Sequence, residues 1–190
     1  MQDEASLVRR ARQRDEEAWV RLYEDNFARI YRYVVLKIGE RTEAEDITQQ
    51  VFVNAIKAIG SYDYKGTPFS AWLYRIAVNK VKDFRRRQRF SSLFSFSEEG
   101  KEQDHPDMGP DSYDHLAGKQ FWIRFNEFIG KLPRLQQEVF RLRFLDHLSI
   151  AEIALTLGKN ESSVKTHLYR AIEKFKNEGF SLGSTPEEAL

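Results

Sequence analysis

Apolar residues recur at helical spacing through the first half of the chain. Intervals of three and four positions mark one buried face of a helix. They occur between Leu7 and Ala11, among Trp19, Leu22, Tyr23, Phe27, Ile30 and Val34, and among Ile47, Val51, Ala55 and Ile59. The pattern breaks at Gly39 and in the segment GSYDYKGTP, residues 60–68, where glycine and proline favour turns. No run alternates with the two-residue period of a strand, so this half is predicted to be helical.

A segment of different composition follows. Residues 91–115 are rich in serine, glycine, proline and acidic residues, and their one apolar patch is Leu93, Phe94 and Phe96. Such a composition is typical of a flexible connection. Helical spacing resumes near Leu116 and lasts to about Asn177, before a tail with no obvious packing face. We therefore predict an all-α protein with a helical domain at 1–90, a flexible acidic linker at 91–115, a second helical domain at 116–178 and a tail at 179–190.

The clearest local signals lie in LSIAEIALTLGKNESSVKTHLYRAIEKFK, residues 148–176. Ser149 and Glu152 have the spacing of a capping box, Gly158 is typical of a helix end, and Asn160 suits the N-cap of a following helix. The expected apolar stripes are Ile150, Ile153, Ala154 and Leu157 in the first helix and Val164, Leu168, Ile172 and Phe175 in the second. Two short helices joined by a glycine turn predict a helix-turn-helix.

The second helix of this motif turns polar side chains outward. They are Ser162, Lys165, Thr166, Tyr169 and Arg170. Such groups can bind base edges and phosphates, and a DNA major groove is wide enough to admit a helix. The solvated face of an ordinary helical hairpin would give the same pattern, so the residues alone leave both interpretations open.

Composition narrows the classes of function. The chain has 30 Lys and Arg against 29 Asp and Glu, a net charge of +1, so attraction to a polyanion requires local segregation of charge. Zero cysteines exclude disulfides and thiolate metal sites. The histidines are scattered, and no glycine-rich phosphate loop or nucleophile motif occurs, which disfavours an enzyme and predicts neither metal nor cofactor. Lacking a signal segment or an apolar run of about 20 residues, the chain is expected to be cytoplasmic, without stable membrane insertion.

Positive charge is concentrated in FSAWLYRIAVNKVKDFRRRQRF, residues 69–90. As a helix this segment buries most of its aromatic residues on one side. Its cations, with only Asp83 against them, are Arg75, Lys80, Lys82, Arg85, Arg86, Arg87 and Arg89. Like charges three and four positions apart repel one another unless a polyanion neutralises them. This cluster therefore favours a nucleic-acid contact over a merely solvated face.

Three motifs occur in an order that resembles a known family. They are AEDITQQVFVNAIKAI at 44–59, FSAWLYRIAVNKVKDFRRR at 69–87, and LPRLQQEVFRLRFLDHLSIAEIALTLGKNESSVKTHLYRAIEKFK at 132–176. From about Asp15 to Asn177 the chain resembles two-domain bacterial sigma factors of the extracytoplasmic-function (ECF) group. The resemblance implies a subunit that binds core RNA polymerase and directs promoter-specific transcription initiation, with no catalytic chemistry of its own. Residues 1–90 would be sigma region 2 and residues 116–178 sigma region 4.

The resemblance also assigns a polymerase-docking role. By motif match it falls on Asp46, Gln49, Gln50 and Asn54, which lie on the helix side opposite Val51 and Ala55. The family commonly has an acid where this chain has Gln50, so docking is expected to rely more on Asp46. A solvated helix face is the alternative for any one of these positions.

Promoter contacts follow in the same way. In the family, the basic helix and the loop before it capture the non-template strand of a −10-type element. Tyr62, Tyr64 and Lys65 belong to the loop, which would offer the pocket. Arg75, Asn79, Lys80 and Lys82 would hold the strand or the duplex edge, and Arg85, Arg86, Arg87 and Arg89 would follow the phosphates. The helix-turn-helix would read a −35-type element through Ser162, Ser163, Lys165, Thr166, Tyr169 and Arg170. His167 lies among them, and its direction is left open.

The expected partners are core RNA polymerase, promoter DNA as duplex and as non-template single strand, and a possible anti-sigma factor, which the residues neither require nor exclude. The resemblance implies that the linker threads through the polymerase, and a soluble tether explains its acids equally well. Those acids are Glu98, Glu99, Glu102, Asp104, Asp107 and Asp111. The competing function is a stand-alone helix-turn-helix regulator, which would bind duplex DNA without polymerase. It would leave the first domain without a purpose.

Overall fold

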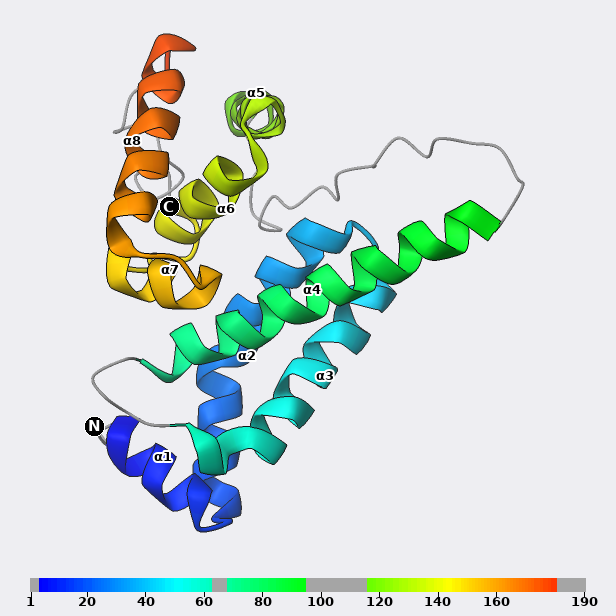
Figure 1. Ribbon diagram of the computed structural model, residues 1–190, viewed down its shortest axis with the longest axis vertical. Helices are drawn as coiled ribbons and strands as arrows, with labels where there is room; N and C mark the ends of the chain where they lie inside the picture. The colour runs from blue at the N-terminus through cyan, green and yellow to red at the C-terminus, as the bar shows by residue number, and fades with distance from the viewer. Residues whose placement is uncertain (1–3, 63–67, 95–115, 181–190) are drawn as a thin grey trace. The chain divides into compact units, whose positions relative to one another are not determined.

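The computed structural model describes residues 4–62, 68–94 and 116–180, and within these residues it contains helices and no strand. The chain divides into two compact units, Met1–Pro106 and Asp107–Leu190 (Figure 1). The predicted all-α class is confirmed over the described parts. The six acids of the expected linker lie outside them. No described helix is long and apolar enough to cross a membrane.

The first unit is built from three long helices and one short one. The long helices α2 (Glu16–Ile38), α3 (Arg41–Ala58) and α4 (Phe69–Phe94) pack against one another, and α1 (Glu4–Arg12) packs on α2 (Figure 1). A short 3-10 turn, η1 (Ile59–Ser61), follows α3. The residues at the centre of this core are Leu22, Ile30, Val34, Val51, Ala55, Leu73, Tyr74 and Ala77. Burying each large apolar side chain stabilises the fold by roughly 1.5–3 kcal/mol.

Local chemistry determines where these helices begin and end. Asp15 caps α2, its carboxylate accepting the N–H of Ala18 at 3.2 Å. At the other end Gly39 has φ of 85°, a left-handed conformation that glycine adopts without strain, as its position at the break in the apolar pattern predicts. Glu40 then caps α3 by accepting the N–H groups of Thr42 and Glu43 at 2.8 and 2.7 Å. These two hydrogen bonds lower the pKa of Glu40.

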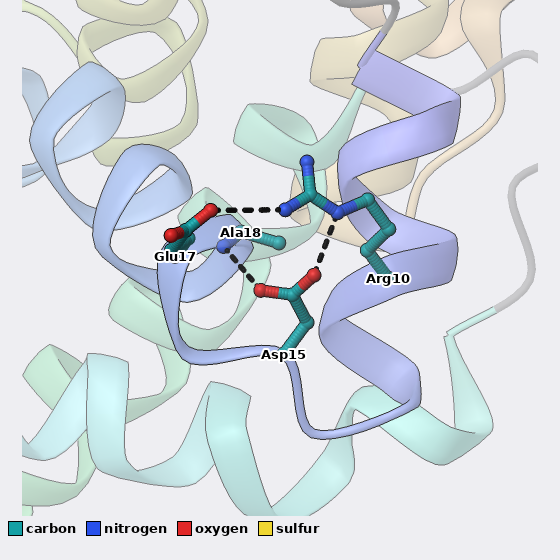
Figure 2. A network of polar contacts seen from close by, with 4 residues as sticks. All are labelled: Arg10, Asp15, Glu17 and Ala18. Atoms are coloured by element: carbon teal, nitrogen blue, oxygen red, sulfur yellow. Dashed lines mark hydrogen bonds and ion pairs between the residues drawn. The ribbon is translucent and has the colours of Figure 1, made fainter.

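The corner between α1 and α2 is held by an ion-pair network (Figure 2). Arg10 Nε donates to Asp15 Oδ2 at 2.6 Å, and Arg10 Nη2 donates to Glu17 Oε2 at 3.4 Å. The hydrogen bond from Arg10 and then that from the Ala18 N–H lower the pKa of Asp15, because both favour the charged carboxylate. One carboxylate thus caps α2 and ties it to α1.

The second unit consists of α5 (Leu116–Lys131), α6 (Arg134–Phe144), α7 (Ile150–Leu157) and α8 (Glu161–Asn177) (Figure 1). Helix α6 packs against both α7 and α8. A cluster of phenylalanine rings forms the core, with Phe125, Phe128 and Phe140 meeting Phe175 of α8 at centroid distances of 5.3 to 6.4 Å. Such edge-to-face and tilted pairs are favourable beyond their buried area.

The predicted helix-turn-helix is confirmed as α7 and α8. The Ser149 side chain accepts the Glu152 N–H at 3.3 Å, and the Glu152 carboxylate accepts the Ser149 N–H at 2.6 Å, which completes the capping box. Gly158 has φ of 63°, and Asn160 accepts the Ser163 N–H at 2.7 Å. Of the expected stripes, Ile153, Ala154, Val164, Leu168 and Phe175 are buried, and Ile150, Leu157 and Ile172 are half-buried.

Two expected boundaries differ from the structure. Helix α4 continues to Phe94, past the expected domain end at residue 90. The tail was expected to have no packing face, and this is wrong for Phe180. Gly179, with φ of 83°, turns the chain back so that the Phe180 N–H reaches the Phe175 carbonyl at 3.3 Å and the two rings stack at 4.6 Å. This is the hydrophobic contact of a glycine-ended helix, and it adds Phe180 to the core.

Replacing Phe180 by alanine is expected to lower the free energy of unfolding of the second unit by about 3 kcal/mol, because it empties a buried ring position. Tyr169→Ala is the matched control, since that aromatic side chain is 69% exposed and its loss is expected to cost under about 0.5 kcal/mol. Hydrogen exchange of α8 amides in the full chain across a urea series measures both values. Equal stability of the two variants would contradict the packing of Phe180.

Asp15→Asn keeps an N-cap oxygen and removes the charge, so it isolates the pairing with Arg10. Because folding lowers the pKa of Asp15, its stabilising contribution is present above the pKa of the unfolded chain and is lost as the pH falls through the lower pKa of the folded state. Melting temperatures should therefore differ at pH 7 and converge as the pH falls below about 4. A difference that stays constant down to pH 2.5 would contradict the ion pair.

Candidate functional site

The first candidate surface is the polar side of α3. Asp46, Gln49 and Gln50 are exposed and Asn54 is half-buried, whereas Val51 and Ala55 on the other side are fully buried. The structure therefore brings together the four residues matched to polymerase docking. We refer to Asp46, Gln49, Gln50 and Asn54 as the α3 face.

Two apolar residues that the sequence pattern did not single out extend this face. Val53 is 47% exposed and Ile56 is 53% exposed, and Val53 lies one turn after Gln49 and Gln50. Both fall outside the buried stripe of Ile47, Val51 and Ala55, which is the signal that could have identified them. An exposed pair of this kind suits a partner contact better than solvent, because burying it on binding releases water from apolar surface.

The second surface is a row along α4. Arg75, Asn79, Lys82, Arg86 and Arg89 follow one another at intervals of four and three residues, which places them on one side of the helix, and all five are exposed. At 1.5 Å per residue the row is about 21 Å long. We call these five residues the basic stripe. A row of this length can contact several consecutive phosphates of one strand.

Two matched cations of α4 have other surroundings. Arg85 is half-buried, and its Nη2 donates to the carbonyl oxygen of Lys37 at 2.7 Å, so it ties α4 to the C-terminal end of α2. The expected contact of Arg85 with the DNA phosphates stays a prediction, because its guanidinium has further donors. Lys80 is also half-buried and faces another side of α4, since it is one residue from Asn79 and two from Lys82. Arg86 pairs with Asp83 at 3.2 Å on the surface, a contact that water and salt weaken.

Tyr62 does not lie on the surface. Its side chain is 5% exposed, and its ring packs against Trp72 and Phe69 at centroid distances of 4.8 and 5.7 Å. Aromatic packing with α4 buries the ring on which a base would stack, so the structure gives the expected contact of Tyr62 with the −10 strand no support, and that contact stays a prediction. Tyr64 and Lys65 lie outside the described residues.

The third surface is the outer side of α8. Ser162, Lys165, Thr166, Tyr169 and Arg170 are exposed, and Ser163 is half-buried. Lys165 lies 3.9 Å from Glu161, a weak surface pair, and the Thr166 hydroxyl donates to the Ser162 carbonyl at 3.0 Å. His167 turns aside, because its ring is half-buried and its Nδ1 is enclosed without a hydrogen-bond partner. Five of the six matched residues thus lie exposed on the outer half of α8, with Ser163 at its edge, and we call the six the α8 row.

Within the described residues, no group of three or more histidine, aspartate or glutamate side chains could hold a metal ion. What the three surfaces offer is contact chemistry: charges, amides, hydroxyls and exposed apolar groups on rigid helices. This arrangement suits binding to large partners.

Comparison with known proteins shows that two parts of the chain, which include these surfaces, match two known protein regions. The chain matches Sigma-70 region 2 over residues 22–91, which include the α3 face and the basic stripe, and Sigma-70, region 4 over residues 123–175, which include the helix-turn-helix. The ECF RNA polymerase sigma factor SigD of Mycobacterium tuberculosis strain H37Rv is 32% identical over 158 residues, which cover 81% of this chain and 73% of SigD. The chain belongs to the ECF RNA polymerase sigma factors.

Two further relatives extend the comparison. The ECF RNA polymerase sigma factor BldN of Streptomyces coelicolor is 36% identical over 166 residues, 87% of this chain and 62% of BldN, so the chain spans less than two thirds of that relative. The fold is also that of the sigma factor RpoE from Bartonella quintana, solved in complex with the anti-sigma factor NepR, with a TM-score of 0.63 and 20% identity, covering 83% of this chain and 94% of RpoE. Helix α1 and Phe180 lie outside both matched regions.

The basic stripe predicts a specific salt dependence. The test removes three of its cations together, as the Lys82→Ala, Arg86→Ala, Arg89→Ala triple variant. For binding to single-stranded promoter DNA, the slope of log Kd against log salt concentration should become shallower by about 2, because each phosphate contact contributes about 0.7. The measurement uses the protein assembled with core RNA polymerase. The control removes three exposed arginines off the stripe, Arg9, Arg29 and Arg41, and should leave the slope unchanged. Equal slopes for the two triple variants would contradict the stripe.

Proposed function

We propose that this ECF sigma factor binds core RNA polymerase and directs promoter-specific transcription initiation by recognising −10 and −35 elements. The observation that supports the proposal is the match to region 2 followed by region 4. Each matched region contains a helix that is buried on one side and exposes polar residues on the other. The protein acts by binding, and the polymerase supplies the chemistry.

The −35 element is read by α8 in the major groove. Ser162 and Ser163 stand in the first turn, where helix N–H groups and the positive end of the helix dipole attract a phosphate. Lys165, Tyr169 and Arg170 follow on the same side and reach base edges. The buried Val164 and Leu168 prevent α8 from rotating, so this face is the one presented to DNA.

The −10 element is held by the first unit. The basic stripe follows the phosphates of the non-template strand, and Asn79 within it has an amide able to donate to and accept from a base edge. Lys80, on another side of α4, is assigned to the same DNA element by its match to the family. The segment before α4, with Tyr64 and Lys65, is assigned to the same strand by its match to the family.

Docking on the polymerase uses the α3 face together with Val53 and Ile56. The Asp46 carboxylate supplies the charge for a basic partner surface, and the amides of Gln49 and Gln50 supply hydrogen bonds. Val53 and Ile56, exposed in the free protein, would lose their water on binding and form the apolar centre that protein interfaces usually have.

An anti-sigma factor is a further proposed partner. Its support is the fold shared with RpoE, which was solved in complex with the anti-sigma factor NepR. A partner that covers the α3 face or the α8 row would compete with polymerase or promoter, because each surface can contact one macromolecule at a time.

Run-off transcription with purified core polymerase and a library of random upstream sequences tests the proposal. The protein is expected to select templates that share two short elements, one upstream of the other, and no transcripts should start from them without it. A stand-alone regulator would select one duplex element in the absence of polymerase, and that result would contradict the proposal.

Lys165→Ala and Ser163→Ala should separate base reading from phosphate contact within α8. Losing a base-edge contact is worth about 1–3 kcal/mol of discrimination, so Lys165→Ala should relax the preference at one or two positions of the upstream element. Ser163→Ala should weaken all upstream elements similarly, with the preference unchanged. Repeating the library selection with each variant measures both effects. An unchanged preference in Lys165→Ala would remove Lys165 from the reading face.

A further inference from the structure

An aromatic ring lies exposed among cations near the C-terminal end of α4. Phe90 is 59% exposed, and every residue from Arg86 to Phe90 is exposed. Val81 is the last residue of α4 that is buried among those whose side chains are described. Figure 1 shows this end of α4 projecting beyond α2 and α3. The Phe90 ring therefore takes no part in the core of the first unit.

Phe90 differs from the other exposed aromatic residues of the described parts of the chain, which are Tyr23 and Tyr169. Tyr23 packs on Phe52 of α3 at a centroid distance of 4.7 Å, and Tyr169 belongs to the α8 row. Phe90 forms no ring pair with any described residue. Single exposed apolar side chains are common on protein surfaces, so the groups around the ring decide what it can bind.

The groups around the Phe90 ring are arginines. Phe90 follows Arg86 by four positions and Arg87 by three, and helical side chains lean toward the preceding turn, so the ring lies between these two residues. Arg86 Nη2 pairs with Asp83 Oδ1 at 3.2 Å, and Arg87 Nε donates to the Asp83 carbonyl oxygen at 3.4 Å. Both guanidinium groups thus point toward the turn of Asp83, which leaves the ring uncovered.

An uncovered ring between two cations suits an unpaired nucleotide. The base can stack on the ring while the guanidinium groups bind the phosphates of the same strand. A base inside a duplex has both faces covered by its neighbours, so the fitting ligand is a single strand. Asp83 is the only acid in α4, and an apolar protein partner would have to cover the arginines without neutralising them. Charge and ring together therefore favour single-stranded nucleic acid.

We propose that Phe90 is a stacking platform for one unpaired base at the C-terminal end of the basic stripe, and that Arg86 and Arg87 bind phosphates next to that base. The inference rests on the proposed contact of the stripe with a DNA strand and adds a base contact to it. Because every base has a face that can stack, Phe90 contributes affinity for the strand and no preference for its sequence.

The test is a double-mutant cycle between the ring and the base. The full chain is assembled with core polymerase, and Kd is measured for single-stranded promoter DNA and for copies that each lack one base but keep the sugar and phosphate. Phe90→Ala should weaken binding of the intact strand about tenfold, the equivalent of roughly 1.4 kcal/mol. For one of the copies it should have no effect, because the base that stacks is already gone. The slope of log Kd against log salt concentration should keep its wild-type value, since phenylalanine carries no charge.

Matched variants separate stacking from other effects. Phe90→Tyr keeps the ring and should bind the strand as the wild type does, whereas Phe90→Leu keeps an apolar side chain without a ring and should show most of the tenfold loss. Ile123→Ala removes an exposed apolar side chain of α5 and should leave Kd unchanged. Because Phe90 and Ile123 are exposed, all four variants should keep the wild-type melting temperature and affinity for core polymerase.

Each of four results would overturn the inference. They are a wild-type Kd in Phe90→Ala, a loss of equal size for every copy of the strand, equal affinities of Phe90→Leu and Phe90→Tyr, and a loss of affinity for core polymerase in Phe90→Ala. The last result would show that a protein surface covers the ring. Transcription from the selected promoters would leave the proposed function standing in all four cases. A wild-type complex that does not bind the strand would overturn both the inference and the proposed role of the stripe.

Discussion

Burial of one stripe on each helix is the constraint on which the surfaces of this protein depend. Val51 and Ala55 are buried in α3, Leu73 and Ala77 in α4, and Val164 in α8. Because a helix with one buried side cannot rotate, burial decides which polar groups face outward and in what order. The α3 face, the basic stripe and the α8 row are consequences of this packing.

Charge is arranged by the same constraint. The net charge is only +1, so the whole protein has little attraction for a polyanion, but the stripe collects cations on one side of α4. Its members repel one another at helical spacing, and Asp83 offsets only part of this through Arg86. In the proposed function a strand of DNA would neutralise the stripe, so that DNA binding and relief of repulsion would be the same event.

The parts of the fold that the sequence predicted are those determined locally. The capping box of Ser149 and Glu152, the left-handed Gly158 and the Asn160 cap depend on residues within four positions of one another, so a pattern identifies them. The residues proposed for polymerase docking were assigned by resemblance, and burial of Val51 and Ala55 agrees with their direction without testing their role.

What the sequence did not predict depends on contacts between distant residues. Tyr62 and Arg85 were assigned to DNA, but packing with Trp72 and a hydrogen bond to the Lys37 carbonyl draw them into the fold. Arg12 and Glu4 of α1 form hydrogen bonds with the backbone of Gly60 and Phe69, 48 and 65 positions away. Phe180 was missed because the turn at Gly179, and not a helical period, returns it to the core.

The central claim is that this chain is a polymerase subunit that binds the polymerase through its α3 face. Co-elution of the purified protein with bacterial core RNA polymerase on a sizing column tests this claim most directly. The account predicts that the wild-type protein and Glu24→Arg, which reverses a charge on α2, co-elute with the core, and that Asp46→Arg elutes free while keeping its fold. Free elution of the wild-type protein, or co-elution of Asp46→Arg at wild-type affinity, would contradict it.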